Sequence, residues 1–250
     1  MIEDRPLVSI VMPAYNSELY IGEAIKSVLS QTYDNWQLLI TDDCSTDNTR
    51  DIVNAFITTD NRIQLFISNE NGGAGKARNN SIEKAKGRFV AFLDADDQWL
   101  PEKLTTQISF MLQHNYAFTF TAYQKIEGGV RKRKVLPPKS TCYKRLLSSN
   151  VIGCLTVIYD TYTLGKRYMP IIRKRQDMGL WLNILKDVPN AYSINKVLAL
   201  YRVDSGMTQN KFKILKWQWL FYRDVVKLSL PQTIYHFFFY SLKGFSKYFS

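Results

Sequence analysis

The sequence predicts an α/β fold with a mostly parallel β-sheet flanked by helices. Between residues 7 and 93, short apolar runs alternate with segments whose apolar side chains recur at helical spacing. The chain has 250 residues, of which 46% are hydrophobic, so it can bury one substantial core. Strands joined by helices pair in parallel through right-handed crossovers, and their carboxyl ends then share one edge of the sheet. Ligands bind at that edge in such folds, so we expect the chemistry there.

The first part of the chain supplies this alternation of strands and helices. Strands are expected at residues 7–12, 36–40, 63–67 and 89–93. Helices are expected at residues 19–31, at 49–56, and from the glycine-rich loop 71–80 to about residue 86. Pro13 is expected to halt the first strand, because proline donates no hydrogen bond to a sheet ladder.

Beyond residue 104 the periodicity is weaker. A helix is expected over 105–112 and a strand over 118–123, and the pair Gly128-Gly129 predicts a hairpin turn after that strand. A further strand is expected at 150–159, a helix up to residue 185 and a strand at 197–200.

Three aspartates, Asp94, Asp96 and Asp97, follow the fourth strand directly. Carboxylates this close repel one another and raise each other's pKa unless a cation or hydrogen-bond donors neutralise them. Mg²⁺ or Mn²⁺ carrying a sugar-nucleotide diphosphate would do so, since these cations take one or two carboxylates plus substrate phosphates. The alternative is that Asp96 or Asp97 only caps the helix that follows.

The formal net charge of +11 indicates a polyanionic partner, which could be nucleic acid, an anionic membrane or a phosphorylated substrate. Basic residues gather at 131–134, at 173–175 and through the aromatic C-terminal segment, a pattern that favours a membrane among these partners. For the run at 131–134 alone, a solvated face is as good an interpretation as a binding role. No nucleic-acid motif is present, so we expect no nucleic-acid partner. The three cysteines have no metal-ligand spacing and the N-terminus is not a signal peptide, so a cytoplasmic location is expected.

The loop at residues 71–80 is rich in glycine and feeds a helix. Lys76 and Arg78 lie near the start of that helix and suit a diphosphate. The Gly-Lys-Ser/Thr ending of a Walker loop is missing. Taken alone, such a loop is more often an ordinary turn than a phosphate site.

Four motifs in register resemble the inverting glycosyltransferases of family 2, which have the GT-A fold. These motifs are residues 8–16, 41–47, 75–79 and 93–97. The resemblance covers residues 7 to 205 and implies a UDP-sugar donor. In this family the first strand end and the second aspartate pair hold uracil and ribose, which implies those roles for Pro13, Tyr15 and Asp43.

The same resemblance implies roles for the basic loop and for the strand-end carboxylates. Arg78 matches the family arginine near the base and phosphates, and Lys76 stands in the same loop. The family's Asp-x-Asp motif matches Asp94, directed towards the ribose, and Asp96 on the metal, which is Mn²⁺ or Mg²⁺. Arg202 matches a Tyr-Arg pair whose loop can close over the diphosphate, although the histidine that often follows is absent here.

Residues 175–182 match the family's acceptor-side motif, with Gln176 in place of the usual glutamate and Asp177 retained. Inverting transfer needs one carboxylate on the acceptor side to take the proton from the attacking hydroxyl. Asp177 is therefore the expected catalytic base. The alternative for this residue is the N-cap of the helix up to residue 185.

Residues 209–250 differ in character from the catalytic domain expected over residues 1–208. Two amphipathic helices are expected, separated at Pro231, and no run reaches the roughly 18 apolar residues that span a bilayer. The first apolar face consists of Phe212, Leu215, Trp219, Tyr222 and Val226, and the second of Tyr235, Phe238, Phe239, Leu242, Phe245 and Phe249, opposite His236, Lys243 and Lys247. Such helices suit a membrane interface, and the alternative is packing on the catalytic domain or on a second subunit.

We therefore expect a metal-dependent inverting glycosyltransferase on the inner face of the cell membrane. Its donor would be a UDP-sugar, and its acceptor a saccharide on a polyprenyl diphosphate, as in O-antigen, capsule or teichuronic-type polymer synthesis. A homo-oligomer is a further expected association. One alternative is a sugar-nucleotide or nucleic-acid binding protein without turnover. Another is a nucleotidyltransferase, which also uses strand-end carboxylates but would not need Asp177.

Overall fold

The computed structural model describes residues 5–203 and 211–249 of the chain. Its strands are β1 (Val8–Ala14), β2 (Trp36–Asp42), β3 (Ile63–Ile67), β4 (Phe89–Phe92), β5 (Gln98–Trp99), β6 (Phe118–Glu127), β7 (Val130–Val135), β8 (Ser140–Thr141), β9 (Ile158–Asp160) and β10 (Ala191–Arg202). Its helices are α1 (Ile21–Leu29), α2 (Thr49–Ile57), α3 (Ala74–Lys84), α4 (Lys103–His114), α5 (Tyr143–Ser148), α6 (Thr161–Leu164), α7 (Gln176–Ile184), α8 (Lys211–Leu220) and α9 (Leu230–Phe249), with a 3₁₀ turn η1 (Cys154–Thr156) and a π-helical turn η2 (Phe221–Val225).

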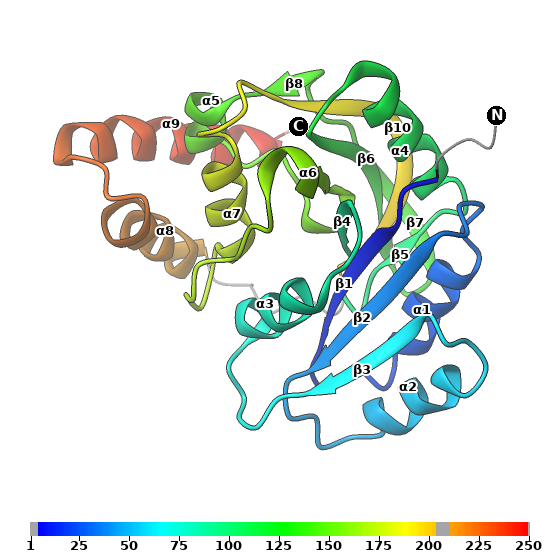
Figure 1. The fold of residues 1–250 in the computed structure, drawn as a ribbon. Coiled ribbons are helices and arrows are strands. Elements are labelled where there is room, and N and C mark those ends of the chain that lie inside the picture. The colour runs from blue at the N-terminus through cyan, green and yellow to red at the C-terminus, as the bar shows by residue number, and fades with distance from the viewer. Residues whose placement is uncertain (1–4, 204–210, 250) are drawn as a thin grey trace.

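The strands form one mixed sheet, flanked by helices (Figure 1). Its hydrogen-bonded order is β3-β2-β1-β4-β9-β6-β10-β5, while β7 pairs with β6 and β8 with β10. Strand β1 is parallel to both β2 and β4, and β6 is parallel to β10. The antiparallel strand β9 joins these two parallel groups, so the sheet is mixed rather than uniformly parallel. The predicted α/β class is confirmed.

Both faces of the central sheet are covered, because successive residues of a strand point to opposite faces. Ile10 of β1 belongs to the core that includes α1, α2 and α4, whereas its neighbour Val11 belongs to the core that includes α3, α5 and α7. Both side chains are fully buried. A strand buried on two faces reads as a continuous apolar run, which is why the sequence pattern located it.

Pro13 does not halt β1, contrary to the sequence prediction. The strand continues to Ala14, and Pro13 pairs in register with Thr41 of β2. The ladder between β1 and β4 ends at Val11 and Phe92. Pro13 therefore has a strand neighbour on one side only, the edge-like setting in which a sheet tolerates a residue without an amide hydrogen.

The apolar run at residues 150–159 is not one strand, contrary to the prediction. Within this run only Ile158–Asp160 forms a strand, and Cys154–Thr156 forms the turn η1. The side chain of Trp99 donates to the Leu155 carbonyl at 2.8 Å, and Gln107 donates to the Thr156 carbonyl at 3.0 Å. These carbonyls bond to side chains instead of a neighbouring strand, so tertiary contacts override the strand propensity of the run.

The hairpin after β6 forms as predicted. Gly128 and Gly129 both have positive φ, at 55° and 77°, which is the conformation that a two-residue hairpin turn requires. The strand that leaves the turn, β7, pairs antiparallel with β6.

The C-terminal helices pack against the catalytic domain on one side. Tyr222 is fully buried and its hydroxyl donates to the Leu147 carbonyl of α5, while Ser148 shares a 2.9 Å hydrogen bond with His236 of α9. Figure 1 shows α9 passing beside α5 and α7. The break between the helices lies at residues 226–229, and Pro231 is the second residue of α9, not a breaker within it. Proline is tolerated in a first helical turn because those amides have no helical acceptor.

Parts of the predicted C-terminal faces lie outside the described residues. The side chains of Phe212, Lys243, Phe245, Lys247 and Phe249 belong to this group, as does the predicted domain boundary at residue 208. Among the residues that the structure describes, none of the helices has the length and apolar character needed to cross a bilayer.

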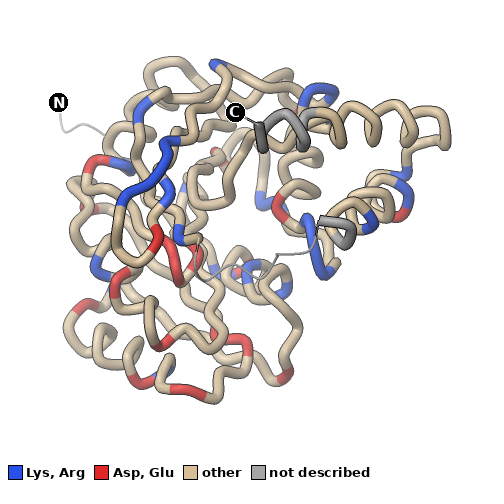
Figure 2. The backbone as a smooth tube through the Cα atoms, turned by 180° about the vertical axis from the view of Figure 1, so that it is seen from behind, with Lys and Arg blue, Asp and Glu red and all other residues tan. Residues whose placement is uncertain are grey.

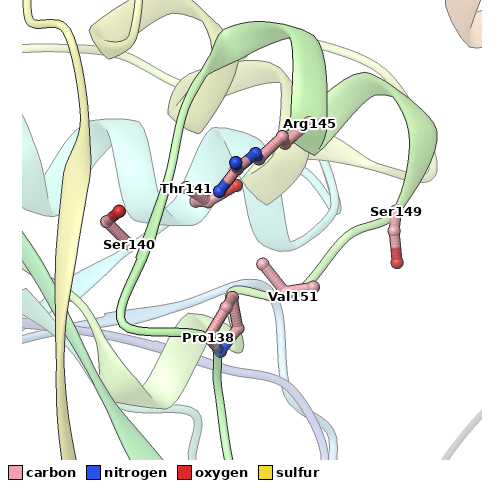
Figure 3. Close-up of a pocket in the computed structure, with 6 residues that line it drawn as sticks. All are labelled: Pro138, Ser140, Thr141, Arg145, Ser149 and Val151. Carbon is pink, nitrogen blue, oxygen red and sulfur yellow. The ribbon is translucent and has the colours of Figure 1, made fainter.

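A small cavity lies at the end of the sheet away from Arg202 (Figure 3). It has a volume of about 250 Å³ and is lined by Pro138, Ser140, Thr141, Arg145, Ser149 and Val151. Thr141 pairs with Ala191, the first residue of β10, whereas Arg202 is the last. The cavity is therefore separate from the edge where the aspartates gather.

Candidate active site

The carboxyl ends of β1, β2 and β4 meet at one edge of the sheet, as the parallel register requires. Ala14 pairs with Asp42, and the amide of Asp43 donates to the Ala14 carbonyl at 2.8 Å. Strand β4 ends at Phe92 beside Val11, and Asp94 follows two residues later. The sheet thus brings the first, second and fourth sequence motifs to one edge.

Arg78 and Asp94 form the central ion pair of this edge. An Arg78 nitrogen, Nη2, lies 2.5 Å from Oδ1 of Asp94, and both side chains are largely shielded from solvent. Burial disfavours the charged form of the Arg78 guanidinium, but the charges of Asp94 and, more weakly, Asp177 outweigh it and raise the pKa of this group above its ordinary value. Arg78 therefore stays charged between two carboxylates, and α3 delivers a permanent cation to the strand ends.

Asp97 is the most buried of the three aspartates, with 1% of its surface exposed. Burial raises its pKa well above the usual carboxyl range, and the charges of Asp94 and Asp96 add to the increase. Its Oδ1 accepts a 2.9 Å hydrogen bond from the amide of Arg202. Burial and the same carboxylates raise the pKa of Tyr201 to about 12. The three carboxylates are therefore close enough to interact, as their spacing predicted.

The capping alternative for these aspartates does not hold. Helix α4 has Glu102 at its N-cap, and no side chain there accepts a capping hydrogen bond. Asp97 instead fixes the end of β10 through the amide of Arg202.

The acceptor-side motif forms the first turn of α7. Arg175 is the N-cap, so the capping alternative for Asp177 is also wrong, and Asp177 lies half-buried within the helix. Gln176 receives a 3.5 Å hydrogen bond from Arg78 and donates to the Ile172 carbonyl at 2.6 Å. Within residues 5–203 and 211–249 the Asp177 carboxylate has no hydrogen bond or ion pair, so its oxygens are available to a substrate hydroxyl.

The predicted uridine-side residues lie at the same edge but differ in exposure. Tyr15 is 51% exposed just after β1, whereas Pro13 is buried within the strand. Asp43 is 3% exposed, and its two carboxylate oxygens accept the amides of Gly72 and Gly73 at 2.9 and 2.7 Å. In this structure Asp43 therefore holds the glycine-rich loop against the end of β2.

The two other predicted phosphate contacts are engaged with acids. Lys76 is exposed on α3 and pairs with Glu70 at 2.6 Å, an interaction that raises the pKa of Lys76. Arg202 is buried, pairs with Glu23 of α1 at 2.7 Å and donates to the Asp96 carbonyl at 3.0 Å. Lys76 can change partners at little cost, because water and salt screen an ion pair on the surface. Arg202 therefore links α1 to the loop that carries Asp94, Asp96 and Asp97.

Charge is distributed unevenly over the molecule. Figure 2 shows acidic residues spread over the half that contains β1 to β3, and a continuous basic stretch along β7. A groove of about 690 Å³ borders Arg202, and its charged lining residues are Glu23, Lys26, Arg131 and Arg202. The basic lining would favour an anionic group beside the aspartate edge.

The aspartates at this edge suit a divalent cation whose remaining ligands come from the substrate. Among the residues that the structure describes, no three or more His, Cys, Asp or Glu side chains are arranged to hold a metal ion. Mg²⁺ and Mn²⁺ commonly take only one or two carboxylates, with substrate phosphates and water as the remaining ligands. Asp94 and Asp96 are the predicted members of that smaller set, and both carboxylates contribute, after burial, to the raised pKa of Asp97.

Several residues at the site were missed by sequence reasoning. Cys154 of η1 lies within the electrostatic reach of Arg78, Asp94 and Asp177, and burial raises the pKa of its thiol well above the usual value. Asp42 is fully buried beside Arg50, and its Oδ2 has no hydrogen-bond partner among the described residues. Asp42 was visible as part of an aspartate pair, but nothing in the sequence distinguished Cys154 or Glu23.

Aspartates at the ends of parallel strands, with Arg78 supplied by α3 and a half-buried carboxylate on α7, form the arrangement expected of a glycosyltransferase with the GT-A fold. Comparison with protein families agrees, since the model of glycosyl transferase family 2 matches residues 9–169. The chain belongs to that family.

Curated relatives match over nearly the whole chain. TuaG of Bacillus subtilis, provisionally named a teichuronic acid biosynthesis glycosyltransferase, is 41% identical over 97% of this chain and 98% of its own. WfgD of Escherichia coli, named UDP-Glc:alpha-D-GlcNAc-diphosphoundecaprenol beta-1,3-glucosyltransferase, is 43% identical over 98% of this chain and 96% of its own. The predictions of family and enzyme class are confirmed.

Solved structures support the fold. The structure of residues 1–349 of TarS from S. aureus in complex with UDP has a TM-score of 0.70 and 22% identity, covering 96% of this chain and 72% of that chain. The predicted GT-A architecture is confirmed by this likeness.

Proposed function

We propose that the protein transfers a sugar from a UDP-sugar to a saccharide on a polyprenyl diphosphate, with inversion, in the synthesis of a cell-surface polysaccharide. The observation that carries the proposal is Arg78, which is paired with Asp94 at the strand ends and faces the Gln176-Asp177 turn. Donor-side and acceptor-side groups thus meet around one buried cation. The names of WfgD and TuaG, which match along nearly the whole chain, support this substrate class.

On the donor side, Asp94 and Asp96 would hold Mn²⁺ or Mg²⁺, which when bound neutralises the charge that develops on the leaving diphosphate. Arg78 supplies a second, permanent positive charge near the same groups. Tyr15 offers an exposed ring at the end of β1 for the base, and the loop held by Asp43 borders the same edge. Pro13, Lys76 and Arg202 remain predicted donor contacts.

On the acceptor side, Asp177 is the proposed base. The acceptor hydroxyl oxygen forms a bond to the anomeric carbon while the bond from that carbon to the β-phosphate oxygen breaks. The hydroxyl proton passes to Asp177 and UDP leaves with the electron pair of the broken bond. Within the part of the chain that the structure describes, the Asp177 carboxylate accepts no hydrogen bond, so it is well suited to take the hydroxyl proton.

We also propose that α9 holds the protein on the inner surface of an anionic membrane. Four apolar residues one turn apart, Leu230, Ile234, Phe238 and Leu242, are each about half exposed and form the α9 stripe. Burying each exposed half would contribute about 1 kcal/mol, and each nearby basic residue about as much again on anionic lipid. Exposed Lys216, Arg223 and Lys227 lie on the segment that precedes α9.

The test is an assay of UDP release and product formation with a panel of nucleotide sugars in the presence of Mn²⁺. UDP-glucose with undecaprenyl-diphosphate GlcNAc is the first pair, because it is the pair in the name of WfgD. The proposal predicts transfer from a UDP-sugar and an inverted anomeric configuration in the product. Retention of the anomeric configuration in the product would contradict the proposed reaction. Transfer from sugars carried on other nucleotides, but not from any UDP-sugar, would contradict it as well.

A further inference from the structure

The inner face of α9 reaches the acceptor-side turn. Arg175, the N-cap of α7, donates a hydrogen bond to the Tyr240 hydroxyl, and its guanidinium lies 5.3 Å from the centre of the Tyr240 ring. The proposed base, Asp177, is two residues further along. A helix at the far end of the sequence thus contacts the turn that carries the catalytic carboxylate.

Arg175 has an unusual backbone conformation. Its φ is 67° and its ψ is 22°, the left-handed region, which a long side chain seldom occupies without support from its surroundings. Its carbonyl accepts the amide of Gly179 at 2.9 Å, so this conformation sets the direction in which α7 begins. The contact with Tyr240 holds the side chain of that strained residue.

The next residue is held from the opposite side. Gln176 bonds to Arg78 and to the Ile172 carbonyl, and it packs so closely on α3 that a Cβ atom on Gly75 would lie 3.0 Å from its side-chain amide. The turn is therefore fixed by α3 on one side and α9 on the other. Asp177, between these supports and the body of α7, takes its position from both.

We propose that Tyr240 is a positioning residue, which through Arg175 holds Asp177 in the direction needed for proton transfer. This inference rests on the proposed role of Asp177. A misplacement of about 1 Å costs on the order of 100-fold in rate, so a small rotation of the turn has a large effect. Tyr240 faces away from the α9 stripe, and one helix therefore joins the proposed membrane contact to the acceptor-side turn.

The experiment compares Arg175→Ala, Arg175→Asn and Tyr240→Phe with the unaltered protein, using UDP-glucose and undecaprenyl-diphosphate GlcNAc. Alanine loses the contact with Tyr240 and strains the left-handed turn, whereas asparagine loses the contact but adopts that conformation more readily. We expect kcat to fall about tenfold in Arg175→Ala, and by a smaller but measurable factor in both Arg175→Asn and Tyr240→Phe, because each of these changes weakens or removes the contact between the two residues. The KM for the donor and the calorimetric affinity for UDP with Mn²⁺ should not change.

The control is Tyr162→Phe, because Tyr162 is an exposed tyrosine whose ring contacts another arginine, Arg88, at 5.2 Å. It should retain full kcat. A lower Tm with unchanged kcat in the Arg175 and Tyr240 variants would overturn the inference and leave a structural contact only. An Arg175→Asn variant with the kcat of the unaltered protein would overturn it as well, because that variant lacks the contact with Tyr240.

Asp177→Asn in the same assay separates this inference from the proposed function. If Asp177→Asn lowers kcat and Tyr240→Phe does not, only the positioning role fails. If Asp177→Asn has no effect, the assignment of the base fails.

Discussion

The donor half of the molecule, β1 to β4 with α1 to α3, is held together differently from the acceptor half, which comprises η1, α7, β10 and the C-terminal helices. In the donor half, β1 to β4 pair with one another in parallel and each motif follows the strand that positions it. In the acceptor half, side chains far apart in sequence hold irregular backbone, as Arg78 does with Gln176 and Tyr240 with Arg175. The proposed donor side is therefore built by the local order of the chain, and the proposed acceptor side by tertiary contacts.

If this division holds, the largest single effect comes from the donor half. Asp96→Ala should abolish transfer, with a loss of at least about 10³-fold in kcat/KM, because a bound cation contributes several kcal/mol to the transition state. The metal-dependent part of UDP affinity should disappear, which calorimetry with and without Mn²⁺ measures. Glu83→Gln, a change at an exposed acid of α3, is the matched control. Unchanged metal-dependent affinity in Asp96→Ala would remove Asp96 from the donor site.

The second prediction, at Asp177, distinguishes the acceptor half from the donor half most clearly. Asp177→Asn should lower kcat by about 10²- to 10⁴-fold and leave UDP affinity unchanged, because the base acts on the acceptor hydroxyl and not on the nucleotide. Steady-state kinetics and UDP calorimetry on the same preparation measure both quantities. Asp187→Asn serves as the control, since Asp187 follows the same helix and forms only a partly exposed pair with Arg167. Comparable turnover in Asp177→Asn and the unaltered protein would assign the base elsewhere.

A smaller effect is expected at the α9 stripe. The double change Ile234→Glu with Phe238→Glu should reduce flotation with anionic vesicles by about tenfold or more, because it replaces apolar contacts with like charge. Binding of the unaltered protein should weaken as salt rises, since exposed charges are screened over about 10 Å at 0.1 M ionic strength. Leu136→Glu, at an exposed apolar residue of another surface, controls for the added charge. Equal flotation of both variants would make α9 a packing or oligomer element.

The smallest effect is expected at Lys103 of α4, which lies between the two halves. Its side chain is fully buried and donates to Gln107 and to the Thr156 carbonyl of η1. Burial lowers its pKa well below the ordinary 10.5, so between these two values the unfolded chain binds a proton that the folded protein does not. The free energy of unfolding should therefore rise with pH across that window.

Lys103→Met lacks this titration, and its Tm should change less with pH from neutral to about pH 10. Thermal melts of both proteins across that range measure the difference. Parallel Tm profiles would show that Lys103 is already charged in the folded protein.

The sequence was informative where structure is local. The apolar runs of β1 to β4 are buried on both faces, so each could be located within a few residues, and the aspartates at their ends were found with them. The extension of β1 through Pro13 was missed, because it depends on where β4 stops pairing and not on proline itself.

The acceptor half was less predictable for a physical reason. Residues 150–159 have the composition of a strand, yet hydrogen bonds from Trp99 and Gln107 fix a turn at Cys154–Thr156. Asp177 could be named through a motif, but its supports could not. Tyr240 lies 65 positions from Arg175, and no periodicity links them.

Strand β7 has a consequence for self-association. Among the described residues it pairs with β6 alone, so its outer edge presents unpaired backbone groups, and an edge of this kind can be extended by a strand from another molecule. Its exposed sequence includes Arg131, Lys132, Arg133 and Lys134. Two copies meeting at this edge would oppose these cations with their own, which disfavours growth of the sheet from one molecule into the next. We therefore expect any homo-oligomer to assemble through a surface other than the β7 edge, and we expect the basic edge to oppose strand-to-strand association at high protein concentration.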